Sequence, residues 1–146
     1  MQRSFKNKAL ALPKMFGMAL LCLLSGTAYA DVAANALPTG GQVVTGNATI
    51  SHDATAPVVN VNQTSQRAVV NWDSFNVGKN ASVTFNQPNA NAVTLNRVTG
   101  ATASMIEGAV KANGQVVFVN PNGVTFGKGA EINAAGVVAT TMDISN

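Results

Sequence analysis

Short runs rich in valine, threonine and other β-forming residues recur along the chain, and polar turn-forming residues separate them. Such runs predict β-strands, and the glycines, asparagines and prolines between them predict tight corners. The segment Ser104–Lys111 is expected to hold at most one helical turn. The predicted strands are Gln42–Thr45, Ala48–Ser51, Val58–Asn62, Arg67–Trp72, Ser82–Asn86, Ala92–Arg97, Gln115–Asn120, Val124–Phe126, Glu131–Asn133 and Gly136–Met142.

Two internal similarities bear on how these strands are arranged. The segment Gly78–Val83 resembles Gly127–Ile132, and Gly114–Val117 is echoed 22 residues later by Gly136–Val138. A repeat near that length is what one turn of a parallel β-solenoid needs, with three short strands and three corners. An antiparallel sandwich also has strands every 8–12 residues or so, and the strand pattern alone does not separate the two folds. The repeat favours the solenoid.

The first thirty residues have the composition of a secretory signal. A basic start is followed by the apolar run Met15–Leu24, and Ala28–Ala30 fits the A-x-A cleavage pattern, which predicts cleavage between Ala30 and Asp31. A membrane anchor is the alternative, but a bilayer span needs roughly 20 apolar residues and this run has about half of them. We expect a signal peptide at 1–30 and no transmembrane segment in the mature chain.

Removing the signal changes the charge balance. The formal net charge of the chain is +3, but four of the nine basic residues lie in the signal. The mature part has five basic residues against six acids, a net charge of −1, which gives no electrostatic support for a nucleic-acid partner. The single cysteine, Cys22, also lies in the signal. The mature chain therefore has no thiol for disulfides or for cysteine–metal sites.

The sequence offers little for catalysis, and we predict that the chain is not an enzyme and needs no cofactor. Its single histidine, His52, stands beside Asp53 without further ligands at a metal-binding spacing, and a surface position is expected for it. The acids are scattered singly, whereas glycoside hydrolysis needs two carboxylates across one cleft.

The segment Asn120–Gly123 is the most distinctive polar cluster. It follows the most apolar strand, and its sequence Asn-Pro-Asn-Gly predicts a tight turn, because proline fixes φ and glycine accepts positive φ. Such a turn, with three exposed polar groups, could also be bound by a partner.

Several motifs occur together in a fixed order and resemble one known family. The motifs are Gln66–Phe75, Leu95–Val98, Asn113–Val124 and Ala139–Ile144. They resemble the N-terminal secretion domain of the two-partner secretion exoproteins, which include filamentous haemagglutinin and the high-molecular-weight adhesins. The resemblance covers residues from about Leu37 to Asn146.

This resemblance implies an all-β fold, a right-handed parallel β-helix with capping strands at its N-terminal end. It implies export through the periplasm to the cell surface or the medium. The partner it implies is a dedicated outer-membrane β-barrel transporter with periplasmic receptor domains. The family's secretion motif maps onto Asn120, Pro121, Asn122 and Gly123. A second family motif, Asn-Pro-Asn-Leu, is absent, and Asn86–Asn89 (Asn-Gln-Pro-Asn) stands near its place.

The resemblance also implies a second candidate function, a surface carbohydrate-binding, haemagglutinating module. On this alternative, we expect the asparagine-rich corners and Trp72 to bind host glycans. At about 22 residues per coil, residues 31–146 predict roughly five coils. At about 4.8 Å between neighbouring strands, these coils would stack to a length on the order of 25 Å. The strand Gly136–Met142 would then have an open edge. We therefore expect this secretion domain to be the front end of a longer exoprotein, or a truncated relic of one.

Overall fold

The computed structural model describes residues 31–143, and every regular element in that part of the chain is a β-strand. None of these residues belongs to a helix that could cross a membrane. The strands are β1 (Gln42–Thr45), β2 (Ala48–His52), β3 (Val58–Gln63), β4 (Arg67–Trp72), β5 (Ser82–Asn86), β6 (Val93–Val98), β7 (Ser104–Ile106), β8 (Ala109–Ala112), β9 (Gln115–Val119), β10 (Val124–Phe126), β11 (Glu131–Asn133) and β12 (Gly136–Thr140).

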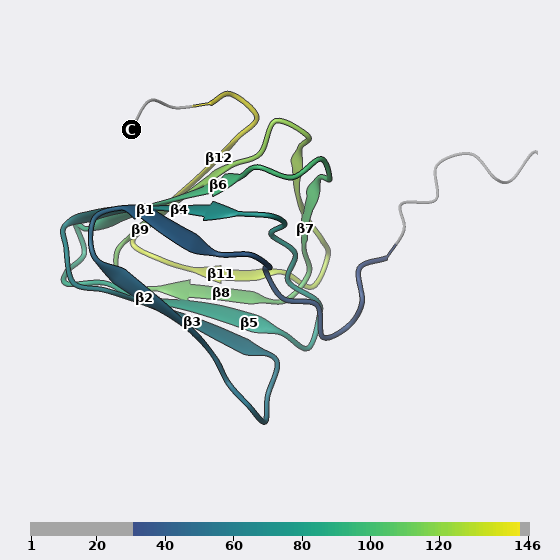
Figure 1. The fold of residues 1–146 in the computed structure, drawn as a ribbon. Coiled ribbons are helices and arrows are strands. Elements are labelled where there is room, and N and C mark those ends of the chain that lie inside the picture. Colours follow the sequence, from purple (N-terminus) through teal and green to yellow (C-terminus); the bar gives the residue numbers. More distant parts are fainter. Residues whose placement is uncertain (1–30, 144–146) are drawn as a thin grey trace, which may run out of the picture. The chain divides into compact units, whose positions relative to one another are not determined.

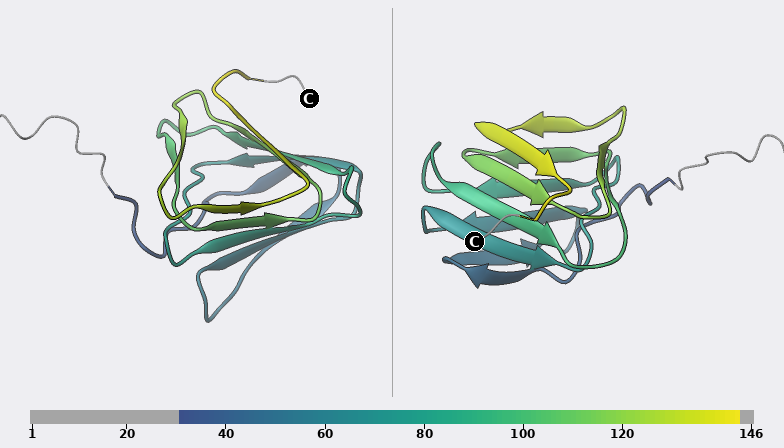
Figure 2. Two further views of the ribbon diagram at one scale, coloured as in Figure 1. Left: turned by 180° about the vertical axis from the view of Figure 1, so that it is seen from behind. Right: turned by 90° about the horizontal axis from the view of Figure 1, so that it is seen from above.

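The strands stack into a β-solenoid with three sides (Figure 1). One five-stranded sheet has the order β1-β4-β6-β9-β12, a second has the order β11-β8-β5-β3-β2, and β7 and β10 form the short third side. All pairs between successive coils are parallel, so each coil repeats the path of the one before (Figure 2). The predicted solenoid is confirmed, and the antiparallel sandwich is wrong.

The first two strands form the N-terminal cap. β1 pairs antiparallel with β4, and β2 pairs antiparallel with β3, so these two consecutive strands each cover the first solenoid strand of one large sheet. The predicted capping strands are therefore present. The solenoid has about four turns rather than the five expected, because the residues before Val58 form the cap and its approach instead of a coil.

The internal similarities match the stacking. Ser82 pairs with Ala109, which pairs with Glu131, so the two similar segments around Ser82 and Glu131 lie two coils apart in one column. Both begin with the same turn, in which an alanine amide donates to a glycine carbonyl three residues earlier, at 2.8 and 3.1 Å. The shorter echo is offset by one residue, because Gly136 pairs with Gln115 and not with Gly114.

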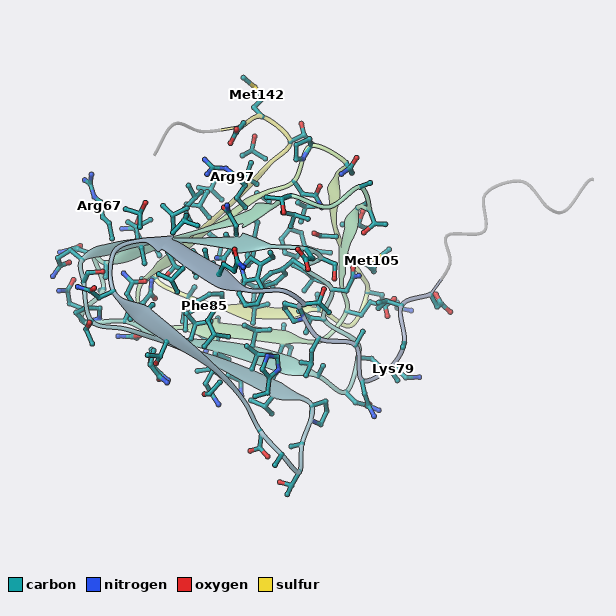
Figure 3. The ribbon with its side chains drawn as sticks, viewed as in Figure 1. Arg67, Lys79, Phe85, Arg97, Met105 and Met142 are labelled. Carbon is teal, nitrogen blue, oxygen red and sulfur yellow. The ribbon has the colours of Figure 1, made fainter. Side chains whose placement is uncertain are left out.

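Alternate side chains of each strand fill the interior. Phe85 points inward from β5 (Figure 3). The ring of Phe75 meets Trp72 edge to face at a centroid distance of 5.4 Å and lies tilted against Phe118 at 5.0 Å. Fully burying one large apolar side chain stabilises a fold by about 1.5–3 kcal/mol, so this continuous core holds the coils together without any disulfide. The remaining buried members of the core are Val59, Val61, Val70, Val77, Ala81, Val83, Val98, Ile106, Val110 and Val116.

The segment Ser104–Lys111, the one segment in which the sequence allowed a helical turn, contains no such turn. The segment contains β7 and β8, and its side chains alternate between buried and less buried positions from Ser104 to Val110. A Cβ at Gly108, between the two strands, would collide with the carbonyl oxygens of Gly78 and Ala81 in the preceding corner, so only glycine fits there. Coil stacking therefore determines the conformation of this segment.

The last coil has an open end, as predicted. Within residues 31–143, β12 pairs with β9 alone, and the strand ends at Thr140 rather than Met142. The apolar side chains Phe126, Val137 and Val138 are 39%, 38% and 53% exposed there. Among the described residues, the last strand therefore has one uncovered hydrogen-bonding edge with exposed apolar side chains beside it.

Candidate functional site

The segment Asn120–Gly123 forms the corner between β9 and β10, and the predicted turn is present. The Gly123 amide donates to the Asn120 carbonyl at 3.0 Å, which closes a four-residue turn. The Asn122 amide donates to the Asn120 side-chain Oδ1 at 2.9 Å. Gly123 has a φ of +112°, a backbone conformation that residues other than glycine rarely adopt. The order of these residues thus follows from the backbone geometry of the corner.

Asn120 is fully buried, which corrects the expectation of three exposed polar groups. Its Nδ2 donates to the Thr102 carbonyl at 3.0 Å and to the Ser104 Oγ at 2.9 Å, and both acceptors belong to the preceding coil. Its own amide donates to the Thr140 carbonyl in the next coil at 3.1 Å. The buried side-chain amide thus ties this corner to the preceding coil, and the backbone amide of the same residue ties it to the next one.

The exposed part of the motif consists of Pro121 and Asn122. The Asn122 Nδ2 donates to the Gly100 carbonyl at 3.0 Å and to the Asn120 Oδ1 at 3.3 Å. The outward surface of the motif is therefore small, and the side-chain amide of Asn122 is already bonded to the preceding coil.

A pocket of about 490 Å³ lies beside this turn. Arg97 on β6 and Asp143 after β12 contribute to its lining, and the Arg97 Nε donates to the Asp143 Oδ1 at 2.9 Å. Figure 3 shows Arg97 and Met142 on the same side of the molecule. Three of the sequence motifs that carry the family resemblance meet here, although they lie far apart along the chain. The pocket lining consists of Arg97, Val98, Thr99, Gly100, Ala101, Val119, Pro121, Asn122 and Asp143.

The turn Asn86–Asn89 holds a second buried amide, which sequence reasoning missed. The Gln87 side chain is 7% exposed and bonds across two coils. Its Oε1 accepts from the Gly114 amide at 2.8 Å, and its Nε2 donates to the Thr94 Oγ1 at 3.0 Å and to the Gln115 carbonyl at 2.8 Å. Gln87 thus ties two successive coils together at the corner after β5, as the Asn120 side chain does at the corner after β9.

The remaining candidates are dispersed. His52 is exposed at the end of β2, as expected for a surface residue. Hydrogen bonds from the Thr55 amide and hydroxyl lower the pKa of the Asp53 carboxyl below its ordinary value, and one from the Ala56 amide adds to this. Within residues 31–143, no three His, Cys, Asp or Glu side chains lie close enough to hold a metal ion.

Trp72 is 1% exposed, and its indole Nε1 donates to the Asn96 Oδ1 at 3.0 Å inside the solenoid. A buried indole offers no face to a sugar ring. The part assigned to Trp72 in the carbohydrate-binding alternative is therefore wrong.

The predicted signal lies outside the described residues. Ala30, on the N-terminal side of the predicted cleavage, belongs to that part, and Asp31 is the first residue that the structure describes. Asp31 is exposed and lies in no regular element.

A capped parallel β-solenoid whose corners are tied by buried amides defines the class: a β-helical domain. Residues 34–146 match the family described as the TPS secretion domain. The chain belongs to this family of two-partner secretion domains. Its function is that of a secretion and targeting domain, and it is exported to the cell surface or the medium.

Relatives support this assignment. Two Haemophilus influenzae proteins described as heme/hemopexin-binding protein, one of them from strain Rd, are each 42% identical to this chain over 130 residues. The match covers 89% of this chain but 14% of each relative. The crystal structure of the HMW1 secretion domain from Haemophilus influenzae superposes with a TM-score of 0.69 at 41% identity, covering 75% of this chain and 28% of that one.

Proposed function

We propose that the periplasmic receptor domains of the transporter bind Asn120–Gly123 before the domain folds, and that the same residues then lock the folded solenoid. The burial of Asn120 carries this proposal, because a receptor cannot reach a side chain that is 0% exposed. Both Nδ2 bonds of Asn120 go to the preceding coil, so its amide is free for a partner only while that coil is not stacked.

Recognition of the unfolded chain would use backbone pairing together with contacts to the asparagine side chains. An extended peptide that adds to a sheet edge gains main-chain hydrogen bonds, and side-chain contacts give it specificity. Coil stacking on the far side of the membrane then removes these groups from the receptor. Folding thereby makes return of the chain unfavourable.

The open end supports the proposal that residues 31–146 are the front of a longer exoprotein. Because β12 exposes Val138 and pairs on one side alone among the described strands, a following coil would find both hydrogen-bonding groups and an apolar surface. The chain spans about a seventh of the curated relatives that it matches, which gives room for many further coils.

The experiment compares receptor binding with folding in matched variants. The double variant Asn120→Ala/Asn122→Ala changes the motif itself. The control Ser104→Ala removes the acceptor of one Asn120 bond and leaves the motif intact. Each chain is captured on the purified periplasmic receptor domains from denaturant, and its secretion is measured in cells that contain the transporter.

We expect the double variant to lose capture and secretion, and Ser104→Ala to keep capture while its folded state is less stable. Equal loss of capture in both chains would show that the motif acts through folding alone. Unaltered secretion of the double variant would contradict the assignment of the motif.

A further inference from the structure

The chain contains two Asn-Gly dipeptides, Asn113–Gly114 and Asn122–Gly123. The first lies at the corner between β8 and β9, and the second at the corner between β9 and β10 of the same coil. Asparagine followed by glycine is the dipeptide most prone to spontaneous deamidation, because glycine has no side chain to hinder attack by its backbone nitrogen. Both asparagines are solvent-exposed, so water reaches them.

At Asn113–Gly114, the turn Asn86–Asn89 of the preceding coil holds both reacting groups. The Asn113 Oδ1 accepts from the Gln87 amide at 2.7 Å, and its Nδ2 donates to the Gln87 carbonyl at 2.6 Å. The Gly114 amide, which would have to attack, donates to the Gln87 Oε1. One buried residue thus fixes the asparagine side chain and the glycine nitrogen at once.

At Asn122–Gly123, the arrangement is equivalent but uses other residues. The Asn122 Nδ2 donates to the Gly100 carbonyl in the preceding coil, and the Gly123 amide donates to the Asn120 carbonyl. Neither group can move toward the other without breaking a hydrogen bond that depends on the stacked coil or the closed turn.

The reaction has two steps. The glycine nitrogen forms a bond to the asparagine Cγ, the bond from Cγ to Nδ2 breaks, and ammonia leaves with the proton from the glycine amide. Water then opens the resulting five-membered imide at either carbonyl, giving aspartate or isoaspartate. No oxidant or reductant takes part, and solvent water is the sole co-reactant.

We propose that Asn113 and Asn122 are deamidation sites that are open in the unfolded chain and closed by coil stacking, and that reaction at either site damages the ability of the domain to fold. A carboxylate at position 122 has no donor for the Gly100 carbonyl, and one at position 113 has none for the Gln87 carbonyl. In both places two acceptors would face each other. Isoaspartate would also lengthen the backbone of a tight corner. This inference does not depend on how the transporter recognises the chain.

The first test measures the reaction in the unaltered full chain. Samples are held in mildly alkaline buffer, either folded or unfolded in guanidinium chloride, and digested with trypsin after increasing times. Cleavage after Lys111 and Lys128 puts both sites on one peptide, together with Asn120, whose following proline has no N–H with which to attack. Fragment masses then assign each conversion of amide to acid.

We expect Asn113 and Asn122 to react in the unfolded chain, Asn120 to stay intact, and folding to slow both reactions at least about tenfold, which corresponds to about 1.4 kcal/mol of opening free energy. Equal rates in the folded and unfolded chains would overturn the protection.

The second test measures the consequence with Asn113→Asp and Asn122→Asp, which reproduce the aspartate product. The control Asn91→Asp adds the same charge at an exposed residue whose side chain bonds to no other described residue. We expect each of the first two variants to lower the ratio of folded to unfolded chain about tenfold or more and the control to leave it nearly unchanged. If all three refold like the unaltered chain, the damage to folding is refuted.

Discussion

Replacing Asn120 by alanine removes a side chain that makes three hydrogen bonds of 3.0 Å or less at one corner, and a longer one of 3.3 Å to the Asn122 Nδ2. Its Nδ2 donates to the Thr102 carbonyl and the Ser104 Oγ, and its Oδ1 accepts from the Asn122 amide. Each such bond contributes about 1 kcal/mol net, so the three together give about 3 kcal/mol. Ser104 is 3% exposed and would remain without this donor, whereas water can reach Thr102. We expect a loss of about 3–4 kcal/mol, a large part of the 5–15 kcal/mol typical of a domain.

Equilibrium unfolding in guanidinium chloride measures this loss directly. Trp72 is the single tryptophan of the chain and is buried, so its fluorescence reports on the core. The control Asn122→Ala removes a side-chain bond at an exposed position, where water can replace it, and should cost about 1 kcal/mol or less. If the two variants lose the same stability within about 0.5 kcal/mol, Asn120 is not the tie between coils that its contacts indicate.

Three further changes test other parts of the structure. Gly123→Ala should lower the unfolding free energy by about 1–3 kcal/mol, measured by thermal melts. The cost comes from backbone strain at φ +112°, since the added Cβ would lie at ordinary contact distance from its nearest neighbour. The control Gly136→Ala, at a residue without positive φ, should be near neutral in these melts. Gln87→Leu should lower the unfolding free energy by about 2–4 kcal/mol in denaturant titration, because it leaves several buried polar groups unpaired; a loss below about 0.5 kcal/mol would contradict this. Because its folded pKa is lowered, Asp53 stabilises its turn fully above the ordinary carboxyl range near pH 3.9 and loses this effect as pH falls through the lower folded value; the Thr55 amide signal should shift only in that acid range, and the shift should be absent in Asp53→Ala.

Most strand positions could be predicted from local composition. The ranges Arg67–Trp72, Ser82–Asn86 and Glu131–Asn133 agree with the structure, because β-branched residues stand between clear turn formers. The exception, Ser104–Lys111, contains methionine, isoleucine, alanine and valine at spacings that suit a helix as well as a strand. Its conformation depends on the close approach of Gly108 to the preceding corner, which local sequence does not reveal.

The site could be predicted only in part. Proline and glycine at positions 121 and 123 indicate the turn, because their backbone preferences are local. The burial of Asn120 depends on Thr102 and Ser104, which belong to another coil and come into contact only through the stacking register. The same holds for Gln87, whose bonds reach residues almost thirty positions away. A long-range polar contact has no signature in a single sequence.

The two demands proposed for Asn120 constrain which residue can stand there. Folding requires a side chain with two donors for the preceding coil and an acceptor for the Asn122 amide, and asparagine meets both needs at the length of this corner. Aspartate keeps the acceptor but lacks the donors, and serine has one donor and a shorter reach. Recognition of the unfolded chain requires only that a receptor can tell asparagine from its substitutes. Asn120→Asp and Asn120→Ser should therefore both weaken the fold, and a receptor that still captures either of them from denaturant would separate the two demands experimentally.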